Sequence, residues 1–250
     1  MTNNTYNLGL VSISFRQHSP LEILQAVKAA GLTCIEWGSD VHAPASNPEK
    51  VREIAAMQKE YGIYCSSYGT YFRYIANPIE ELQSYIDTAK LLGTDILRLW
   101  CGPKSGAEMT EAEKDELFAL CRQSEKLAAE NGVTLCMECH QNTFTERVDD
   151  AVELMKALYS PHFQMYWQPL NDNPETNIAS AKAIAPYSSH LHVYNWKSGV
   201  KYPLAQAIDA WRSYVKEFTT PRTLLLEFMP DNRLASLAAE ADALRQIIGG

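Results

Sequence analysis

The chain has 250 residues, of which 46% are hydrophobic, and its formal net charge is −8. This acidic balance, with no long run of Lys or Arg, argues against a nucleic-acid partner, whose phosphates must be neutralised by basic side chains. Because no apolar run approaches the length of a membrane span, we expect no membrane association either.

The start of the chain and its cysteines both indicate a cytoplasmic protein. Residues 1–5 are polar and lack the basic start and apolar stretch of a secretory leader. Six cysteines are scattered along the chain, and Cys136 and Cys139 have C-x-x-C spacing. On a strand these two side chains would point to opposite faces, and no second pair follows. We therefore interpret the cysteines as reduced thiols rather than as a zinc or redox site.

A repeat runs through the first half of the chain: a helical pattern, then a glycine, then a short apolar strand. Each glycine stands where the end of a helix requires a positive φ. The repeated segments are 30–37, 61–65, 92–100 and 131–138. Capping residues mark the helix starts at Ser19-Pro20, Asn47-Pro48, Asn77-Pro78 and Thr110-Glu111.

The second half keeps this rhythm less regularly. Together with residues 8–13, further strands are expected at 163–167, 189–194 and 223–228, and helices at 148–158, 177–185, 204–218 and 234–248. Eight strands that alternate with eight helices predict a parallel sheet closed into a (β/α)8 barrel, the TIM-barrel fold, as a single domain over residues 1–250. A doubly wound open sheet is the alternative, but no G-x-G-x-x-G follows the first strand.

The segment 133–142 shows where chemistry enters this pattern. Side chains alternate faces along a strand, so one face carries Cys136, Glu138 and His140, and the other carries Leu135, Met137 and Cys139. A carboxylate at the end of a mostly apolar strand is costly unless it is paired, hydrogen-bonded or bound to a metal. Glu138 therefore needs a partner.

Polar and aromatic residues gather at the other predicted strand ends as well, which is the face where such barrels place their active sites. Four tryptophans at strand ends fit either a core or an apolar wall around a small cavity, and we favour the wall. The expected substrate-binding residues are Arg16, Glu36, His42, Tyr68, Arg98, Trp100, His140, Trp167 and Trp196.

Four of the strand-end side chains can converge above the barrel axis to hold a metal. Glu138 and Glu227 offer carboxylates, His192 an imidazole and Gln168 an amide oxygen. Mostly hard oxygen ligands with one nitrogen suit Mn²⁺, which we expect, with Mg²⁺, Co²⁺ or Zn²⁺ as alternatives. Such a metal could polarise a carbonyl and stabilise an enediolate while a carboxylate moves a proton. We expect no organic cofactor.

Six motifs along nearly the whole chain resemble the xylose isomerase-like TIM-barrel superfamily, often called sugar phosphate isomerases/epimerases. They are similar to a branch of that family other than the ketose epimerases. The motifs are Ser14-Phe15-Arg16, residues 35–44, Glu138-Cys139-His140, residues 166–169, His190-Leu191-His192-Val193 and Leu226-Glu227-Phe228.

The resemblance implies a metal held by Glu138, Gln168, His192 and Glu227, with the two glutamates as acid and base. Gln168 departs from the family, which has Asp at this position, and the lost negative charge should weaken metal affinity. The family's substrate-binding His after this ligand is also missing. His42, on the loop after the second strand, is a candidate substitute acid/base or substrate contact.

These observations predict a metal-dependent isomerase or epimerase of a small sugar or polyol derivative, with the paired glutamates transferring a proton. Two alternatives stay open: a dehydratase acting on a related keto-polyol, and a metal-free, non-catalytic sugar-binding barrel. A three-zinc endonuclease would need more histidines than the six present. The expected partner is a small carbohydrate, and the sequence leaves open whether the chain forms a homo-oligomer.

Overall fold

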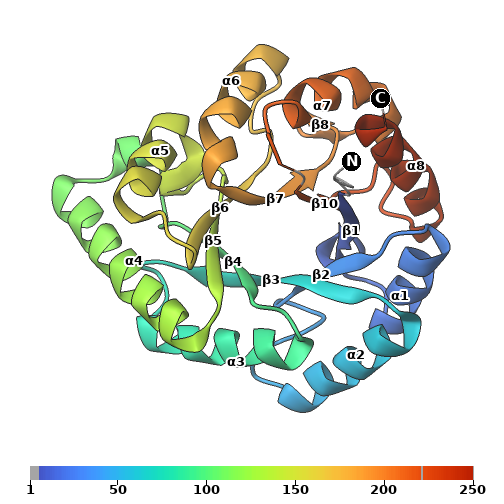
Figure 1. The fold of residues 1–250 in the computed structure, drawn as a ribbon, viewed down its shortest axis with the longest axis horizontal. Helices are drawn as coiled ribbons and strands as arrows, with labels where there is room; N and C mark the ends of the chain where they lie inside the picture. The colour runs from blue at the N-terminus through green and yellow to red at the C-terminus, as the bar shows by residue number, and fades with distance from the viewer. Residues whose placement is uncertain (1–5, 221, 250) are drawn as a thin grey trace.

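A closed barrel of parallel strands surrounded by helices forms the structure, a computed structural model that describes residues 6–220 and 222–249 (Figure 1). Residues 1–5, on which the absence of a leader was argued, lie outside the described residues. The strand order is β1-β2-β3-β4-β5-β6-β7-β10, and β1 pairs with β10 to close the ring. The predicted (β/α)8 architecture is therefore confirmed.

The barrel strands alternate with helices as the repeat predicts. Bounds of the strands are β1 (Asn7–Val11), β2 (Cys34–Gly38), β3 (Tyr64–Arg73), β4 (Ile96–Trp100), β5 (Thr134–Glu138), β6 (Phe163–Trp167), β7 (Ser188–Val193) and β10 (Thr223–Leu226). The helices are α1 (Pro20–Ala29), α2 (Pro48–Tyr61), α3 (Leu82–Leu92), α4 (Glu111–Asn131), α5 (Val148–Leu158), α6 (Pro174–Ile184), α7 (Ile208–Val215) and α8 (Leu237–Ile248). Within the described part of the chain, no helix has the length and apolar character needed to cross a membrane.

Local signals in the sequence explain most of the helix boundaries. Ser19 and Thr110 form complete capping boxes at the starts of α1 and α4. Gly62, which ends α2, has a φ of 68°, a left-handed conformation that glycine adopts without a steric cost. The cap expected at Asn77 is wrong: its side chain accepts from the Arg73 backbone N–H instead, and α3 begins only at Leu82.

Two features of the second half were not predicted. A short antiparallel hairpin, β8 (Trp196–Lys197) and β9 (Val200–Lys201), stands between β7 and α7. The helix expected from residue 204 starts with a 3-10 turn, Leu204–Ala207, before α7 begins. Both features lie in the connection after β7, so they shape the rim of the barrel rather than its wall.

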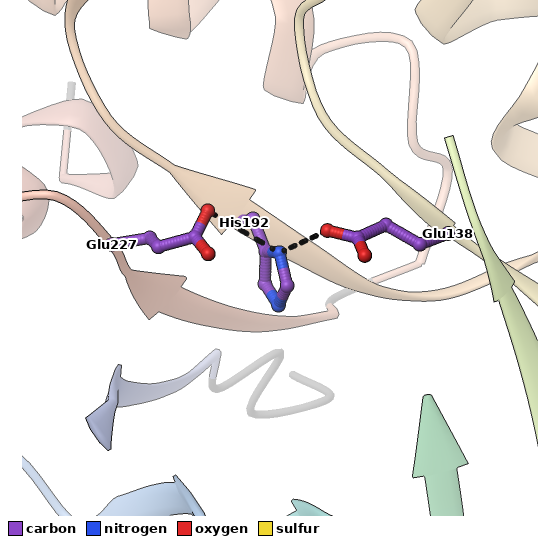
Figure 2. Close-up of side chains that lie close together, drawn as sticks. All are labelled: Glu138, His192 and Glu227. Carbon is purple, nitrogen blue, oxygen red and sulfur yellow. Dashed lines mark hydrogen bonds and ion pairs between the residues drawn. The ribbon is translucent and has the colours of Figure 1, made fainter. Parts of the chain in front are cut away.

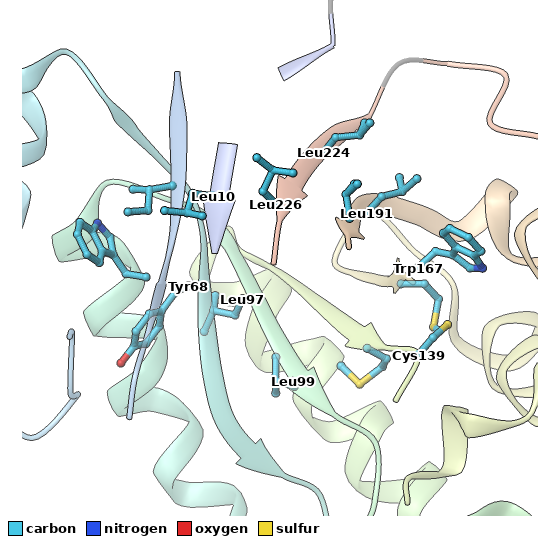
Figure 3. Packing of buried hydrophobic residues seen from close by; sticks show 14 of the residues in the cluster. Leu10, Tyr68, Leu97, Leu99, Cys139, Trp167, Leu191, Leu224 and Leu226 are labelled. Atoms are coloured by element: carbon cyan, nitrogen blue, oxygen red, sulfur yellow. The ribbon is translucent and has the colours of Figure 1, made fainter. Parts of the chain in front are cut away.

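Two separate hydrophobic clusters follow from the alternation of side chains along the strands. The larger one fills the layer between strands and helices and includes Leu135 and Met137 (Figure 3). The smaller one lies inside the barrel and includes Cys136, Tyr166 and Leu225. The two faces predicted for segment 133–142 are thus confirmed for β5, and the polar residues that follow lie above the inner cluster.

Candidate active site

Three side chains meet at one end of the barrel: those of Glu138, His192 and Glu227 (Figure 2). They come from the end of β5, from β7 and from the residue after β10. The Nδ1 atom of His192 lies 3.2 Å from Oε1 of Glu138 and 3.5 Å from Oε2 of Glu227. One potential ligand atom from each residue lies within 4.8 Å of the other two. All three side chains are buried, so their charges interact in a poorly solvated environment.

The backbone places each of these groups at the point where a buried strand ends. Glu138 is the last residue of β5, and Glu227 directly follows β10. The next residue, Phe228, has a φ of 57°, and its N–H donates to Ser14 Oγ at 3.2 Å. This left-handed turn, which is uncommon for an aromatic residue, takes the chain out of the barrel and leaves Glu227 at its mouth.

A cavity of about 800 Å³ opens above this group at the carboxyl ends of the strands. Its size is within the range of small-molecule sites. Of the residues expected to bind metal or substrate, the cavity brings together Arg16, Arg98, Trp100, Glu138, His140, Gln168, Trp196 and Glu227.

Glu138 is held as a carboxylate by several donors. Its Oε2 accepts from Arg98 Nη1 at 2.9 Å and from Trp100 Nε1 at 2.5 Å, and its Oε1 accepts from Gln168 Nε2 at 3.2 Å. Burial alone would raise the pKa of Glu138, but Arg98 and His192 outweigh it and hold the pKa well below its usual range. Glu138 is therefore a fixed anion at neutral pH.

Glu227 has the opposite environment. Its Oε2 is buried and has no hydrogen-bond partner among the described residues. Burial raises the pKa of Glu227 to about 7, and the charge of Glu138 adds to this rise while His192 opposes it. A carboxyl group with a pKa near neutrality can both accept and return a proton, as acid–base catalysis requires.

His192 links the two carboxylates. Burial would lower the pKa of its imidazole, but the carboxylates of Glu227 and Glu36 outweigh burial and raise the pKa to about 10. Its Nε2 lies 3.5 Å from Glu36 Oε1, on the side away from Glu138 and Glu227. The two ring nitrogens therefore face different carboxylates.

Gln168 completes a set of groups that fits a divalent cation. Its Nε2 donates to the Cys139 carbonyl at 2.7 Å, whereas its Oε1 is buried and has no hydrogen-bond partner within the described part of the chain. Buried acceptors without partners are rare and need an explanation. The free acceptors of Gln168 and Glu227, together with Glu138 and His192, form an oxygen-rich set with one nitrogen, which suits Mn²⁺, Mg²⁺ or Co²⁺.

Comparison with known proteins identifies the family. The model of the xylose isomerase-like TIM barrel family matches residues 24–246. The chain belongs to this family. Among curated proteins, it is 23% identical over 122 residues to a 3-dehydroshikimate dehydratase of Bacillus anthracis. That alignment covers 48% of this chain and 44% of the relative, so the chain spans less than half of the relative's length in the match.

Solved structures of the same fold include members with different activities and ligands. A probable 3-DHS dehydratase of Bacillus anthracis superposes with a TM-score of 0.78 at 20% identity, covering 95% of this chain and 98% of that one. A D-allulose 3-epimerase of Methylomonas sp. gives 0.75 at 12% identity, with 98% of each chain covered. A barrel protein of Mycobacterium smegmatis in complex with magnesium gives 0.73 at 15%, covering 98% and 97%.

Two residues expected to bind substrate belong to the hydrophobic layer outside the barrel of this xylose isomerase-like chain. Trp167 is fully buried against the rings of Trp211 and Phe218, and its Nε1 donates to Ser180 Oγ at 3.1 Å. Tyr68 is also fully buried and donates its hydroxyl to the Ala43 carbonyl at 2.6 Å. The alternation of the strands turns both side chains towards the helices, so these two predictions are corrected.

His42 and Glu36 also lie away from the cavity. The His42 ring is buried, with Nδ1 3.1 Å from Ser12 Oγ and Nε2 3.2 Å from the His18 carbonyl. These contacts occupy both ring nitrogens, which corrects its proposed role as an acid/base or substrate contact. Glu36 points into the barrel but lies beneath the cavity, against Arg98 and His192.

Several cavity residues were missed by the sequence analysis. Tyr71 and Tyr194 were visible as polar groups at strand ends, but they were not selected. Asp172 accepts from the backbone N–H and the hydroxyl of Ser198, which joins the loop after β6 to the β8–β9 hairpin. No sequence signal reveals this contact, because it joins two irregular segments that are distant in the chain.

The corrected position of Trp167 gives a direct test. We expect Trp167→Phe to lower the free energy of unfolding by about 1–3 kcal/mol, since it removes buried volume and a hydrogen bond. The matched change Trp196→Phe, at a residue that is 39% exposed on the cavity rim, should alter stability by less than about 0.5 kcal/mol. Urea unfolding measures both, and equal losses would contradict the assignment.

The shifted groups also predict how stability depends on pH. The folded-state pKa values of His192, about 10, and Glu227, about 7, both exceed their ordinary values. The folded protein therefore binds these protons more tightly, and their contribution to stability is lost as the pH rises through these values. In chelator, urea unfolding should show stability falling from pH 6.5 to 9.5, and less so in His192→Gln. A rise over this interval would contradict the assignment.

Proposed function

We propose that this protein is a metal-dependent isomerase or epimerase of a small sugar or polyol derivative. The observation that carries the proposal is the unequal pair of glutamates across His192. Glu138 is a carboxylate fixed by three donors, whereas Glu227 has a free buried oxygen and a pKa near 7. Such a pair can keep one charge in place while the other group moves a proton.

The metal in this proposal is Mn²⁺, with Glu138, Gln168, His192 and Glu227 as its ligands. The free acceptor of Gln168 supports its place in the set, although its neutral amide contributes less charge than a carboxylate would. When bound, a divalent cation polarises a substrate carbonyl and so acidifies the neighbouring C–H bond.

Within this set, we assign the proton transfer to Glu227. Glu227 lines the cavity, and a base with a pKa near the working pH transfers protons efficiently in both directions. Glu138 would act mainly as a fixed ligand, because Arg98 and Trp100 stabilise its charged form. Transfer by Glu227 alone keeps the proton on one face of the substrate, so an epimerase, which must return it to the opposite face, would also use Glu138 as the second proton-transferring group. The sequence-based expectation that the two glutamates act as acid and base is kept here, with unequal roles for the two.

The cavity walls favour a substrate rich in hydroxyl groups and without a phosphate. Two of its cationic side chains are already paired: Arg16 with Asp40 at 2.5 Å, and Arg98 with Glu138 at 2.9 Å. The partly exposed ring of Trp196 offers an apolar face of the kind on which the C–H groups of a sugar ring pack.

A dehydratase is the second candidate, and the similarity to the Bacillus anthracis dehydratase favours it. Removal of a proton next to a carbonyl also begins an elimination of water, so the same residues could serve. Incubation with 3-dehydroshikimate and with ketoses separates the two candidates by product mass. Loss of 18 Da identifies a dehydratase, whereas a product that keeps the substrate's composition, apart from deuterium gained from D₂O, identifies an isomerase or epimerase.

Dependence on a metal is the first prediction of this proposal. Protein stripped with chelator should catalyse no hydrogen exchange between D₂O and a panel of ketoses and inososes, and Mn²⁺ should restore it. Mass spectrometry measures the deuterium that enters the substrate. Protein that takes up no divalent cation and shows no thermal shift with any of them would instead be a metal-free sugar-binding barrel.

The two glutamates should respond differently to the same substitution. We expect Glu227→Gln to reduce deuterium exchange by at least about 10³-fold while retaining measurable Mn²⁺ binding, because it removes the mobile proton acceptor. Glu138→Gln should lower Mn²⁺ affinity more strongly, because it removes the permanent negative charge. Calorimetric titration with Mn²⁺, run beside the exchange assay, would contradict this assignment if the two variants behaved alike.

A further inference from the structure

We infer that Glu36, sealed beneath the cavity, is a positioning residue that aims Nδ1 of His192 at the metal site. This inference rests on the proposed metal-dependent function and adds a residue outside the ligand set. Glu36 does not line the cavity, and its side chain is 0% exposed. Its influence must therefore pass through the groups that it contacts.

Glu36 makes three polar contacts inside the barrel. Its Oε1 lies 3.5 Å from His192 Nε2 and 3.4 Å from Arg98 Nε, and its Oε2 accepts from Ser67 Oγ at 2.8 Å. Ser67 thus fixes one oxygen of the carboxylate, which leaves the other directed at His192 and Arg98. Both of these residues also form ion pairs with Glu138.

The contacts of His192 give Glu36 a defined task. An imidazole that binds a metal through one nitrogen carries its proton on the other, and a carboxylate that accepts this proton fixes the ring orientation and raises its basicity. Here Nε2 faces Glu36 and Nδ1 faces Glu138 and Glu227. Nε2 has no hydrogen-bond partner among the described residues, and Glu36 Oε1, 3.5 Å away, is the carboxylate placed to accept its proton while the lone pair of Nδ1 binds the cation.

A glycine on β3 shows that space is kept for this arrangement. A Cβ atom at Gly69 would lie 2.5 Å from Glu36 Oε1 and 2.9 Å from Arg98 Nη2. Any side chain at this position would push the Glu36–Arg98 pair away from the strand. The β3 backbone at Gly69 can therefore lie close to the Glu36 carboxylate, and this close approach determines the position of Glu36 beneath His192.

Balancing the charge of Arg98 is the simpler explanation of Glu36, but Arg98 already has a shorter contact with Glu138, at 2.9 Å. The two roles also have different consequences. A residue that only balances charge would affect stability, whereas a positioning residue would change metal affinity and the geometry of the bound ion. Co²⁺ reports the latter through its visible absorption spectrum.

The test compares wild type with Glu36→Gln and with Glu240→Gln as the matched control. Glu240 is also a buried glutamate, but it lies on α8 and accepts from the Leu204 N–H, away from the cavity. Calorimetry with Mn²⁺ should show affinity falling about 10- to 100-fold in Glu36→Gln, with a changed Co²⁺ spectrum. Glu240→Gln should leave both unchanged. Wild-type affinity and spectrum in Glu36→Gln would overturn the inference.

Two further variants keep the test decisive. Glu36→Asp retains the charge but has a shorter side chain, so this variant should also bind Mn²⁺ more weakly than wild type. Wild-type Mn²⁺ affinity in Glu36→Asp would show that only the charge of Glu36 matters and would overturn the positioning role. If Glu36→Gln does not fold, Ser67→Ala carries the test, and unchanged Mn²⁺ affinity in that variant overturns the inference. Wild-type protein that binds no metal would instead refute the proposed metal-dependent function itself.

Discussion

A buried network of charges inside the barrel mouth is the constraint on which the rest of the structure depends. Glu36, Glu138 and Glu227 surround Arg98 and His192, and all five side chains are almost fully removed from water. Charges buried in this way are destabilising unless they are paired with good geometry. The barrel supplies that geometry, because strands far apart in the chain point these side chains at one another, as Figure 2 shows for Glu138, His192 and Glu227.

The network gives two similar carboxylates, Glu138 and Glu227, different surroundings and different expected roles. Several donors keep Glu138 ionised, while Glu227 Oε2 accepts no hydrogen bond from a described residue and lies 3.5 Å from His192 Nδ1. The surroundings thus shift the pKa values of two groups of the same chemical type in opposite directions, down for Glu138 and up for Glu227. This division supports Glu227 as the main proton-transferring group in the proposed reaction.

Much of the fold and part of the site could be predicted from the sequence, because both depend on local periodicity. The glycine-ended helices and apolar strands gave the barrel, and the position of Glu138 at the end of an alternating strand marked it as unusual. The roles of the tryptophans were harder to predict, because Trp100 and Trp167 both lie at strand ends. Only the direction of each side chain, into the barrel or towards the helices, separates a cavity residue from a core residue. The β8–β9 hairpin and the Asp172–Ser198 contact depend on tertiary packing and left no local pattern.

The proposed function depends on a divalent cation that binds between Glu138, His192 and Glu227. The most direct test is a crystal structure of the protein soaked in Mn²⁺, with an anomalous difference map calculated from data collected near the manganese absorption edge. We predict one strong peak bonded to Nδ1 of His192 and to both carboxylates, with Gln168 Oε1 turned towards it. The absence of a peak at this position, or a His192 ring that binds through Nε2, would contradict the proposed metal site.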